Sequence, residues 1–190
     1  LAHADKLLFM PDLFAYFLTG VQRAEFSIAS TSQLLDPVTH DWNTPLLDEL
    51  GIPARLLPPV IKTGETYGLL TDEICEELGC PKVPVIAVAT SAVASVPSQD
   101  DDFVYISCGT WSLFGTELDH PVIDDKSFAH NFTNEGGVGY SVRFLKNIIG
   151  LWLIQESRRQ WIREGAQVTY ADLEREAVAC EPFRCFIDPD

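Results

Sequence analysis

Basic residues are scarce in this chain: of its 190 residues, 13 are Lys or Arg and 28 are Asp or Glu, giving a formal net charge of −15. A field of that sign repels nucleic acids and anionic membranes, so we expect neither as a partner. Any bound phosphate should be held by backbone N–H groups or a metal ion rather than by a basic patch. The simpler interpretation of the acidity is a well-solvated surface. Hydrophobic residues make up 46% of the chain, which supports a substantial core and excludes wholesale disorder.

Cysteine spacing typical of metal sites is also missing. The five cysteines, Cys75, Cys80, Cys108, Cys180 and Cys185, include no Cys-x-x-Cys pair and have no nearby pair of histidines. Cys75 and Cys80, like Cys180 and Cys185, are separated by five positions. We predict reduced thiols in a cytoplasmic protein, with oxidation of one pair as the alternative.

The sequence has neither a long apolar run nor a secretion signal. No stretch approaches the roughly 20 apolar residues of a membrane span, and no charged segment leads into a cleavage site. The chain lacks an initiator Met, opens within a helical pattern and ends in the pattern of a strand. These features predict an internal fragment of a larger protein.

Hydrophobic spacing, together with Gly and Pro punctuation, predicts helices mixed with strands. The expected helices are residues 7–18, 27–35, 44–51, 71–78, 142–164 and 170–179. The expected strands are residues 85–89, 103–108 and 112–116, the first with an unbroken apolar pattern that suits burial on both faces. The fold class is therefore α/β. A domain boundary is expected near residue 98, because residues 97–102 combine Pro, Ser and a run of Asp.

The strand–turn–strand segment at residues 103–117 is the first candidate site. Gly109 allows a sharp turn that could bring backbone N–H groups close to an anion. Ser107, Thr110 and Ser112 can add hydroxyl donors, which suits a phosphate bound where the protein's field is already negative. The alternative is an ordinary β-hairpin with Gly at its turn.

Two amides interrupt the apolar face of the helix expected over residues 142–164. Asn147 and Gln155 are eight residues apart, which on one helix means about 12 Å along the axis and a rotation of about 80°. They could face a cleft and bind a ligand at different depths, or simply satisfy neighbouring backbone groups. The Gly- and Asn-rich segment at residues 131–140, expected to be a loop, could approach a sugar or could be only a tight turn.

Five blocks of the sequence resemble the FGGY carbohydrate kinases, and within that family its rhamnulokinase branch. They are SIASTSQLLDPVTHDWNTPLLDELGIP, VPVIAVAT, YISCGTWSLFGTELDHPV, NFTNEGG and RFLKNIIGLWLIQESRRQW. The resemblance implies an actin-like (ribonuclease H-like) ATPase fold of two domains, with only its middle portion present. Residues 1–98 would end the N-terminal, sugar-binding domain, and residues 99–190 would begin the C-terminal, ATP-binding domain.

The same resemblance implies transfer of the γ-phosphate of ATP, with Mg²⁺, to the 1-hydroxyl of L-rhamnulose, giving L-rhamnulose 1-phosphate. By their places in the matched motifs, Thr110 would contact the ATP phosphates, with Ser107 and Gly109 beside it. Asn147 would contact the sugar, and Gln155 would contact the nucleotide. The expected partners are therefore small molecules, the sugar and ATP.

The catalytic base of that family is missing from this sequence. After the strand that ends at Thr90 the family carries His-Asp-Thr-Ala, whereas here Ser91 follows Thr90 directly. We therefore assign no catalytic residue. Either these four residues belong to the protein and are omitted here, or the deletion is real and the chain is a non-catalytic sugar- or nucleotide-binding module.

Two further functions are compatible with the residues. Another FGGY kinase, such as one for L-fuculose, is possible in principle because sugar choice depends on few contacts. A hydrolase that uses Cys108 as nucleophile is disfavoured, because none of the four histidines comes with an identifiable orienting partner.

Overall fold

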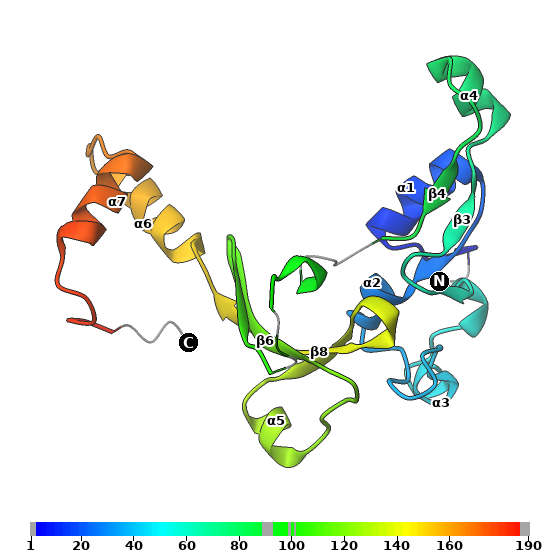
Figure 1. Ribbon diagram of the computed structural model, residues 1–190, viewed down its shortest axis with the longest axis horizontal. Coiled ribbons are helices and arrows are strands. Elements are labelled where there is room, and N and C mark those ends of the chain that lie inside the picture. The colour runs from blue at the N-terminus through cyan, green and yellow to red at the C-terminus, as the bar shows by residue number, and fades with distance from the viewer. Residues whose placement is uncertain (1–2, 89–92, 99, 101, 187–190) are drawn as a thin grey trace. The chain divides into compact units, whose positions relative to one another are not determined.

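The computed structural model of the chain describes residues 3–88, 93–98, 100 and 102–186 (Figure 1). Two compact units make up the chain: residues 1–105 with 115–146, and residues 106–114 with 147–190. The junction between Thr90 and Ser91, where the family's base is expected, lies outside the described residues. The boundary expected near residue 98 concerns the family's domains and stays a prediction.

Cap residues set the ends of the first unit's helices, largely where the sequence predicts them. Helix α1, Met10–Thr19, carries Pro11 in its first turn and stops at Gly20, which has a left-handed φ of 71°. Helix α4, Asp72–Leu78, begins after Thr71, whose hydroxyl accepts a hydrogen bond from a backbone N–H of the first turn. The other α-helices among the described residues of this unit are α2, Phe26–Ser30, which is shorter than predicted, α3, Thr44–Glu49, and α5, Asp125–Ala129.

Two small sheets lie in the N-terminal half of the chain. Strands β1, Ala24–Glu25, and β2, Val60–Ile61, pair in parallel, and β3, Thr66–Leu69, pairs antiparallel with β4, Pro84–Ile86. The prediction of a strand buried on both faces over residues 85–89 is wrong for its described part: Ile86 is 46% exposed and Val88 is exposed. Within the described residues β4 is an outer strand with β3 as its one partner, so much of its surface is uncovered.

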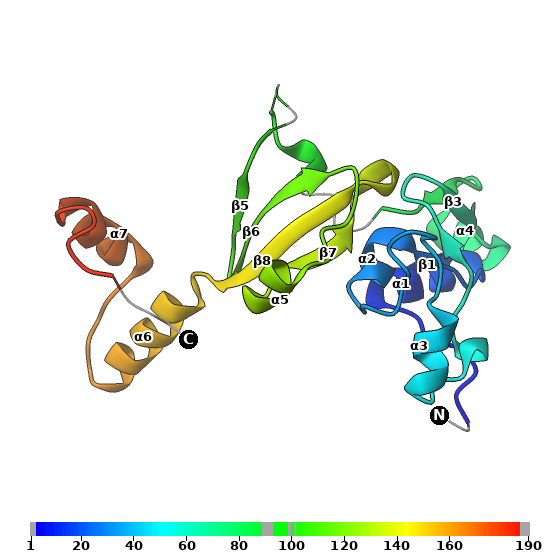
Figure 2. The same cartoon turned by 90° about the horizontal axis from the view of Figure 1, so that it is seen from below.

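A four-stranded sheet follows, with the hydrogen-bonded order β5-β6-β8-β7 (Figure 2). Its β7–β8 pair is antiparallel, with Thr133 opposite Leu145 and Gly136 opposite Val142. Residues 131–140, expected to be a loop, therefore contain a strand. The strands are β5, Tyr105–Cys108, β6, Trp111–Leu118, β7, Thr133–Gly136, and β8, Val142–Ile149.

The long helix expected over residues 142–164 is wrong. Its first third is strand β8, and only Trp152–Arg163 is helical, as α6. Gly150 separates the two elements, and pairing with β7 gives β8 backbone partners that a helix would have found locally. Helix α7, Tyr170–Ala179, has the predicted bounds. None of the described helices is both long and apolar enough to cross a membrane.

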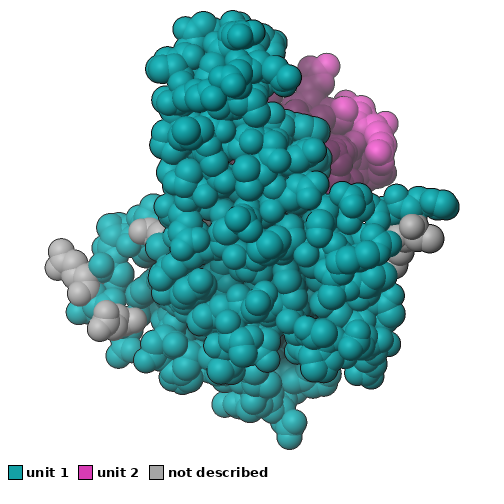
Figure 3. All heavy atoms as spheres, turned by 90° about the vertical axis from the view of Figure 1, so that its right-hand side faces the viewer, with its two compact units in different colours: residues 1–105, 115–146 teal, residues 106–114, 147–190 magenta. Residues whose placement is uncertain are grey.

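The hydrophobic core lies in the first unit (teal in Figure 3). Ala15, Tyr67 and Ala87 form one buried cluster, which packs α1 against β3 and the chain after β4. Leu47, Leu56 and Leu145 are the largest fully buried apolar side chains. Removing such a side chain typically costs about 2–5 kcal/mol, so these residues stabilise the frame of the first unit.

A buried carboxyl lies beside this cluster. Asp12 is 0% exposed, and its Oδ1 accepts hydrogen bonds from the Glu25 N–H at 3.0 Å and from the Tyr67 hydroxyl at 2.5 Å. Its Oδ2 has no hydrogen-bond partner in the described part of the chain. Burial raises the pKa of Asp12 above its usual value, although the bonds from Tyr67 and Glu25 act in the opposite direction. The folded protein therefore binds this proton more tightly than the unfolded chain does.

Stability should consequently fall with rising pH through this group. Asp12 contributes its full stabilising effect below its unfolded pKa of 3.8 and loses it as pH rises through the raised folded-state pKa. We expect Asp12→Asn, which keeps an acceptor for Glu25 and Tyr67, to make the free energy of unfolding decline less steeply above pH 4. Urea denaturation of both proteins across this range measures the two slopes, and parallel slopes would contradict the assignment.

Candidate functional site

The turn between β5 and β6 forms the platform on which helix α6 begins. The Gly109 N–H donates to the Trp111 carbonyl at 3.0 Å, so this donor is engaged within the turn. The Leu151 N–H donates to the Gly109 carbonyl at 3.0 Å, and the Trp152 N–H to the Thr110 carbonyl at 3.2 Å. Both turn carbonyls thus satisfy N–H groups at the start of the helix, which receives no side-chain cap from the described residues.

This arrangement shows how the backbone of Gly109 is used within the turn. Its N–H group faces the chain's own carbonyl and is not presented to an anion. Gly109 stays a predicted part of the nucleotide site, where its lack of a side chain allows the backbone to turn tightly. A side chain at this position would bring its Cβ 3.2 Å from the Trp111 carbonyl oxygen.

Gly150 makes the close docking of α6 possible. A Cβ at this position would lie 2.4 Å from Ser112 Oγ, 2.6 Å from the Gly109 carbonyl oxygen and 2.9 Å from the Ser112 nitrogen. Two of these three atoms belong to the backbone, so they cannot move away through a side-chain rotation. The turn and the helix can therefore approach this closely only because residue 150 has no side chain.

Docking brings two of the predicted nucleotide contacts together. The Gln155 side-chain amide donates to the Thr110 hydroxyl at 3.4 Å, although 45 positions separate them in sequence. Thr110 is exposed, so its hydroxyl is accessible to a ligand. The pair combines a hydroxyl and an amide, which can hydrogen-bond to phosphate or ribose oxygens without adding charge.

The other predicted contacts lie on the strands of the same unit. Ser107 is exposed on β5, and Asn147 is exposed near the end of β8. The expectation that Asn147 and Gln155 share one helix is wrong, because a strand end and the turn at Gly150 separate them. No hydrogen bond or ion pair among the described residues joins Asn147 to Thr110 or Gln155, so the part of Asn147 in the site stays a prediction.

Two arginines of α6, Arg158 and Arg159, are engaged by other groups of the protein and not by Thr110 or Gln155. Arg158 donates to the Val168 carbonyl at 2.8 Å and covers the Tyr170 ring, while Arg159 pairs with Glu156. Nor do three or more His, Cys, Asp or Glu side chains gather as metal ligands anywhere in the described part of the chain. Mg²⁺ needs only one or two carboxylates when nucleotide phosphates supply its other ligands.

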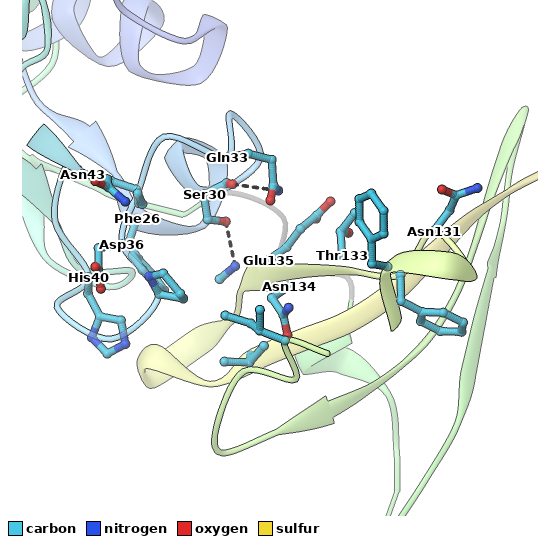
Figure 4. A pocket seen from close by; sticks show the side chains of 17 residues that line it. Phe26, Ser30, Gln33, Asp36, His40, Asn43, Asn131, Thr133, Asn134 and Glu135 are labelled. Atoms are coloured by element: carbon cyan, nitrogen blue, oxygen red, sulfur yellow. Dashed lines mark hydrogen bonds between the residues drawn. The ribbon is translucent and has the colours of Figure 1, made fainter. Parts of the chain in front are cut away.

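A second candidate is a pocket of about 550 Å³ in the first unit (Figure 4). It is built from α2 with the segment that follows it and from β7 with the segment that precedes it, both within blocks that carry the family resemblance. The Gly136 N–H donates to the Ser30 hydroxyl at 2.6 Å and joins the two walls. A Cβ on Gly136 would lie 2.5 Å from the Phe26 ring, so only glycine permits this contact.

Unusual backbone conformations gather at this pocket. Gln33, His40 and Asn131 line it with left-handed φ angles of 61°, 59° and 56°, and such conformations are typical of tight, specific loops. Of the Asn and Glu residues in the segment 131–140, Asn134 exchanges hydrogen bonds with the Val122 backbone through both ends of its amide, and Glu135 is paired with Arg143. These two therefore support the fold, and Asn131 is left as the candidate ligand contact of that segment.

Two sequence profiles of known families match the chain. The N-terminal domain of the FGGY family of carbohydrate kinases matches residues 1–96, and the C-terminal domain of the same family matches residues 104–190. The chain belongs to the FGGY family of carbohydrate kinases. The resemblance seen in the sequence motifs is thereby confirmed, and this FGGY chain contains parts of both family domains.

Curated relatives narrow the similarity within the FGGY family. The chain is 46% identical to "Rhamnulokinase" of Bacteroides thetaiotaomicron over 98% of its own length and 39% of the relative's. It is 40% identical to "Rhamnulokinase" of Enterococcus faecalis over 99% of its own length and 38% of the relative's. The chain thus spans about two fifths of the length of these relatives.

Solved structures confirm the fold class of this FGGY chain. The ligand-bound xylulose kinase from Lactobacillus acidophilus aligns with a TM-score of 0.76 at 19% identity, covering 95% of this chain and 36% of that one. A xylulose kinase from Brucella ovis aligns with a TM-score of 0.75 at 20% identity, covering 92% and 36%. The chain is therefore part of an α/β, actin-like sugar-kinase fold.

Proposed function

We propose that this chain belongs to an ATP-dependent kinase that phosphorylates the 1-hydroxyl of L-rhamnulose, giving L-rhamnulose 1-phosphate. The observation that carries the proposal is the identity of 46% and 40% to two rhamnulokinases along almost the whole chain. The contact between Thr110 and Gln155 supports it, because two predicted nucleotide contacts meet at the accessible turn. Since the chain spans 39% of its first relative, the activity is proposed for a protein that carries the remaining family sequence.

In this proposal the chain's own residues bind and orient the substrates. The Thr110 hydroxyl donates to an ATP phosphate oxygen, Ser107 adds a second hydroxyl, and Gln155 positions Thr110 while contacting the nucleotide. Asn147 contacts the sugar. Bound Mg²⁺ would neutralise charge on the transferred phosphoryl group, and positioning supplies much of the rate in such reactions. The base that accepts the hydroxyl proton is expected between Thr90 and Ser91, outside the described residues.

The domain assignment and cellular location belong to the same proposal. Residues 1–98 would contribute to the sugar-binding domain and residues 99–190 to the ATP-binding domain, which agrees with matched ranges that end at residue 96 and resume at residue 104. A kinase that consumes ATP and a small sugar would act in the cytoplasm.

A coupled phosphorylation assay with L-rhamnulose, L-fuculose and D-xylulose tests the substrate. We expect kcat/KM to be highest for L-rhamnulose; preference for L-fuculose would reject the specific substrate and keep the family. The intact mass of the protein from its natural source tests the non-catalytic alternative. A mass equal to the 21.1 kDa of this sequence would mean that the missing base is a true deletion, and the kinase proposal would fail.

The Thr110–Gln155 contact gives a second, local test. Thr110→Val removes a hydroxyl that would bond to a charged phosphate, which is typically worth about 1.5–3 kcal/mol, so we expect kcat/KM for ATP to fall about 10- to 100-fold. Gln155→Leu should cause part of the same loss, and the double variant should lose less than the sum of the two effects. Gln160→Leu on the same helix, where Gln160 pairs with exposed Glu164, should leave kinetics unchanged. Full additivity would show that Thr110 and Gln155 do not act together.

A further inference from the structure

The end of helix α4 brings two thiols together. Gly79 adopts a left-handed φ of 62°, and its N–H donates to the Cys75 carbonyl. The Cys80 N–H donates to the same carbonyl at 3.1 Å. This is the Schellman geometry of a helix end, in which the side chains on either side of the glycine, five positions apart, come into contact. Here both of those positions are cysteines, so the helix end places the two thiols next to each other.

Both thiols are accessible from solvent. Cys75 and Cys80 are free and half-buried, and no described residue of α4 is fully buried. The helix projects from the β3–β4 pair (Figure 1), so a small oxidant can reach its end. Burial raises the pKa of Cys75 more than the Lys82 ammonium lowers it, and Lys82 is itself paired with Asp72 at 2.8 Å.

The two cysteines differ in their surroundings. Burial, reinforced by the neighbouring Cys80, raises the pKa of the Cys75 thiol above its usual value. The raised pKa disfavours the Cys75 thiolate, which suits Cys75 to the second, resolving step.

The same chain contains a natural comparison for this geometry. Cys180 and Cys185 are also five positions apart and also follow the end of a helix. Cys180, however, is extended, with φ −79° and ψ 150°, and no left-handed glycine turns the chain back after α7. Its N–H donates to carbonyls within the helix, those of Glu176 and Ala177, and no such bond ties Cys185 to it in the described residues. Equal spacing is therefore accompanied by a Schellman turn at α4 and not at α7.

We propose that Cys75 and Cys80 are a reversible dithiol modification site, which a peroxide converts to a disulfide across the end of α4. The Cys80 thiolate attacks one peroxide oxygen, so that an S–O bond forms, the O–O bond breaks and hydroxide leaves to become water. Cys75 then gives up its proton and attacks the Cys80 sulfur; the S–S bond forms, the S–O bond breaks and a second water leaves. Two electrons pass from the two thiols to the peroxide.

The second step should be fast because the helix end already holds the resolving cysteine beside its partner. The hydrogen bond from the Cys80 N–H to the Cys75 carbonyl fixes the backbone of both residues. Little conformational entropy therefore remains to be lost before the S–S bond forms. Reduction by a dithiol reagent breaks the same bond and returns both thiols. The disulfide would join the end of α4 to the segment that leads into β4.

Peptide mapping of the folded protein after limited hydrogen peroxide and thiol blocking tests the proposal. We expect a Cys75–Cys80 disulfide, lighter by two hydrogens, to form at least about tenfold faster than one between Cys180 and Cys185, and dithiothreitol to remove it. In Cys75→Ser, Cys80 should stop as a sulfenic acid that dimedone traps. Equal rates for the two pairs, or separate oxidation of Cys75 and Cys80 in the unsubstituted protein, would overturn the proposal.

A second variant separates geometry from spacing. Gly79→Val keeps both cysteines five positions apart but places a β-branched residue where φ is 62°. We expect disulfide formation to slow to the rate of the Cys180–Cys185 pair, while circular dichroism reports whether the rest of the protein stays folded. A folded variant that forms the disulfide at the original rate would show that the cap geometry is irrelevant and would refute the argument. All these readouts are independent of kinase activity.

Discussion

Gly150→Ala should lower kcat/KM of the proposed kinase activity about 100-fold, because a displacement of about 1 Å in a positioned site can cost that much. The added Cβ would lie 2.6 Å from the Gly109 carbonyl oxygen and 2.9 Å from the Ser112 nitrogen, so the turn must move away from the start of α6. Thr110 and Gln155, which barely reach each other at 3.4 Å, would then separate. Steady-state kinetics and ATP titration by calorimetry measure the loss, and thermal unfolding should show a cost of about 1–3 kcal/mol.

Two controls sharpen the Gly150 prediction. Adding Ser112→Ala removes the atom at 2.4 Å but leaves both backbone contacts, so it should not restore activity. Gly165→Ala in the same unit places its Cβ in open space at a φ of 95°. It should therefore lower stability through backbone strain and leave kcat/KM unchanged. Recovery of activity in the Gly150→Ala, Ser112→Ala double variant would show that the turn itself had not moved.

Arg143→Met should destabilise the first unit by about 3–5 kcal/mol, the usual cost of breaking a buried ion pair from one side. Arg143 is 3% exposed, its guanidinium lies 2.9 Å from Glu135, and its Nε donates to the Gly136 carbonyl at 2.9 Å. The variant leaves the largely buried Glu135 carboxylate without its cation, and it removes the Arg143 N–H that donates to the Gly136 carbonyl. Urea denaturation of the two proteins gives the difference in the free energy of unfolding.

The surface pair of α6 is the matched control for this second prediction. Arg159 pairs with Glu156 while its side chain is 61% exposed, so Arg159→Met should change the free energy of unfolding by less than about 0.5 kcal/mol. The double variant Arg143→Met, Glu135→Gln replaces the unpaired carboxylate with a neutral amide, so it should recover part of the lost free energy of unfolding. Equal effects of Arg143→Met and Arg159→Met would mean that burial does not strengthen the need for the Arg143–Glu135 pair.

Local chemistry made the capped helices predictable. Gly20 and Gly79 end α1 and α4 in left-handed conformations, Thr71 caps the start of α4, and the predicted bounds of α7 agree with the structure. Each of these signals depends on residues a few positions apart, and a single sequence contains that information. The turn at Gly109, with hydroxyl residues on either side, is predictable for the same reason.

The failure at residues 142–164 shows where local information ends. Apolar residues at positions 144, 145, 148, 149, 152 and 153 satisfy a helical period across the boundary between β8 and α6. Gly150, unfavourable inside a helix by about 1 kcal/mol, was the available sign of a break. What decides the matter is pairing of β8 with β7, a segment whose Gly and Asn content does not favour a strand. Such pairing is a tertiary property and cannot be read from either segment alone.

The site was predictable as a set of residues, and its geometry was not. Motif positions selected Thr110 and Gln155, but their hydrogen bond depends on how α6 docks on the turn. The pocket lined by Gln33, His40 and Asn131 was not predictable. The one sequence sign of it was that two distant blocks, which form its walls, resemble the same family. The thiol pair at α4 was visible as a spacing, yet Cys180 and Cys185 share that spacing without sharing the geometry.

The docking of α6 on the turn also provides an intrinsic spectroscopic probe. The amide protons of Leu151 and Trp152 are bound by the carbonyls of Gly109 and Thr110 and not by any carbonyl of their own helix. Their exchange with deuterated solvent therefore requires the turn and the helix to part, whereas exchange farther along α6 requires the helix to unwind. Comparing the protection of these two amides with that of Ser157 or Arg158 would measure how often this junction opens, before any ligand is added and without any substitution.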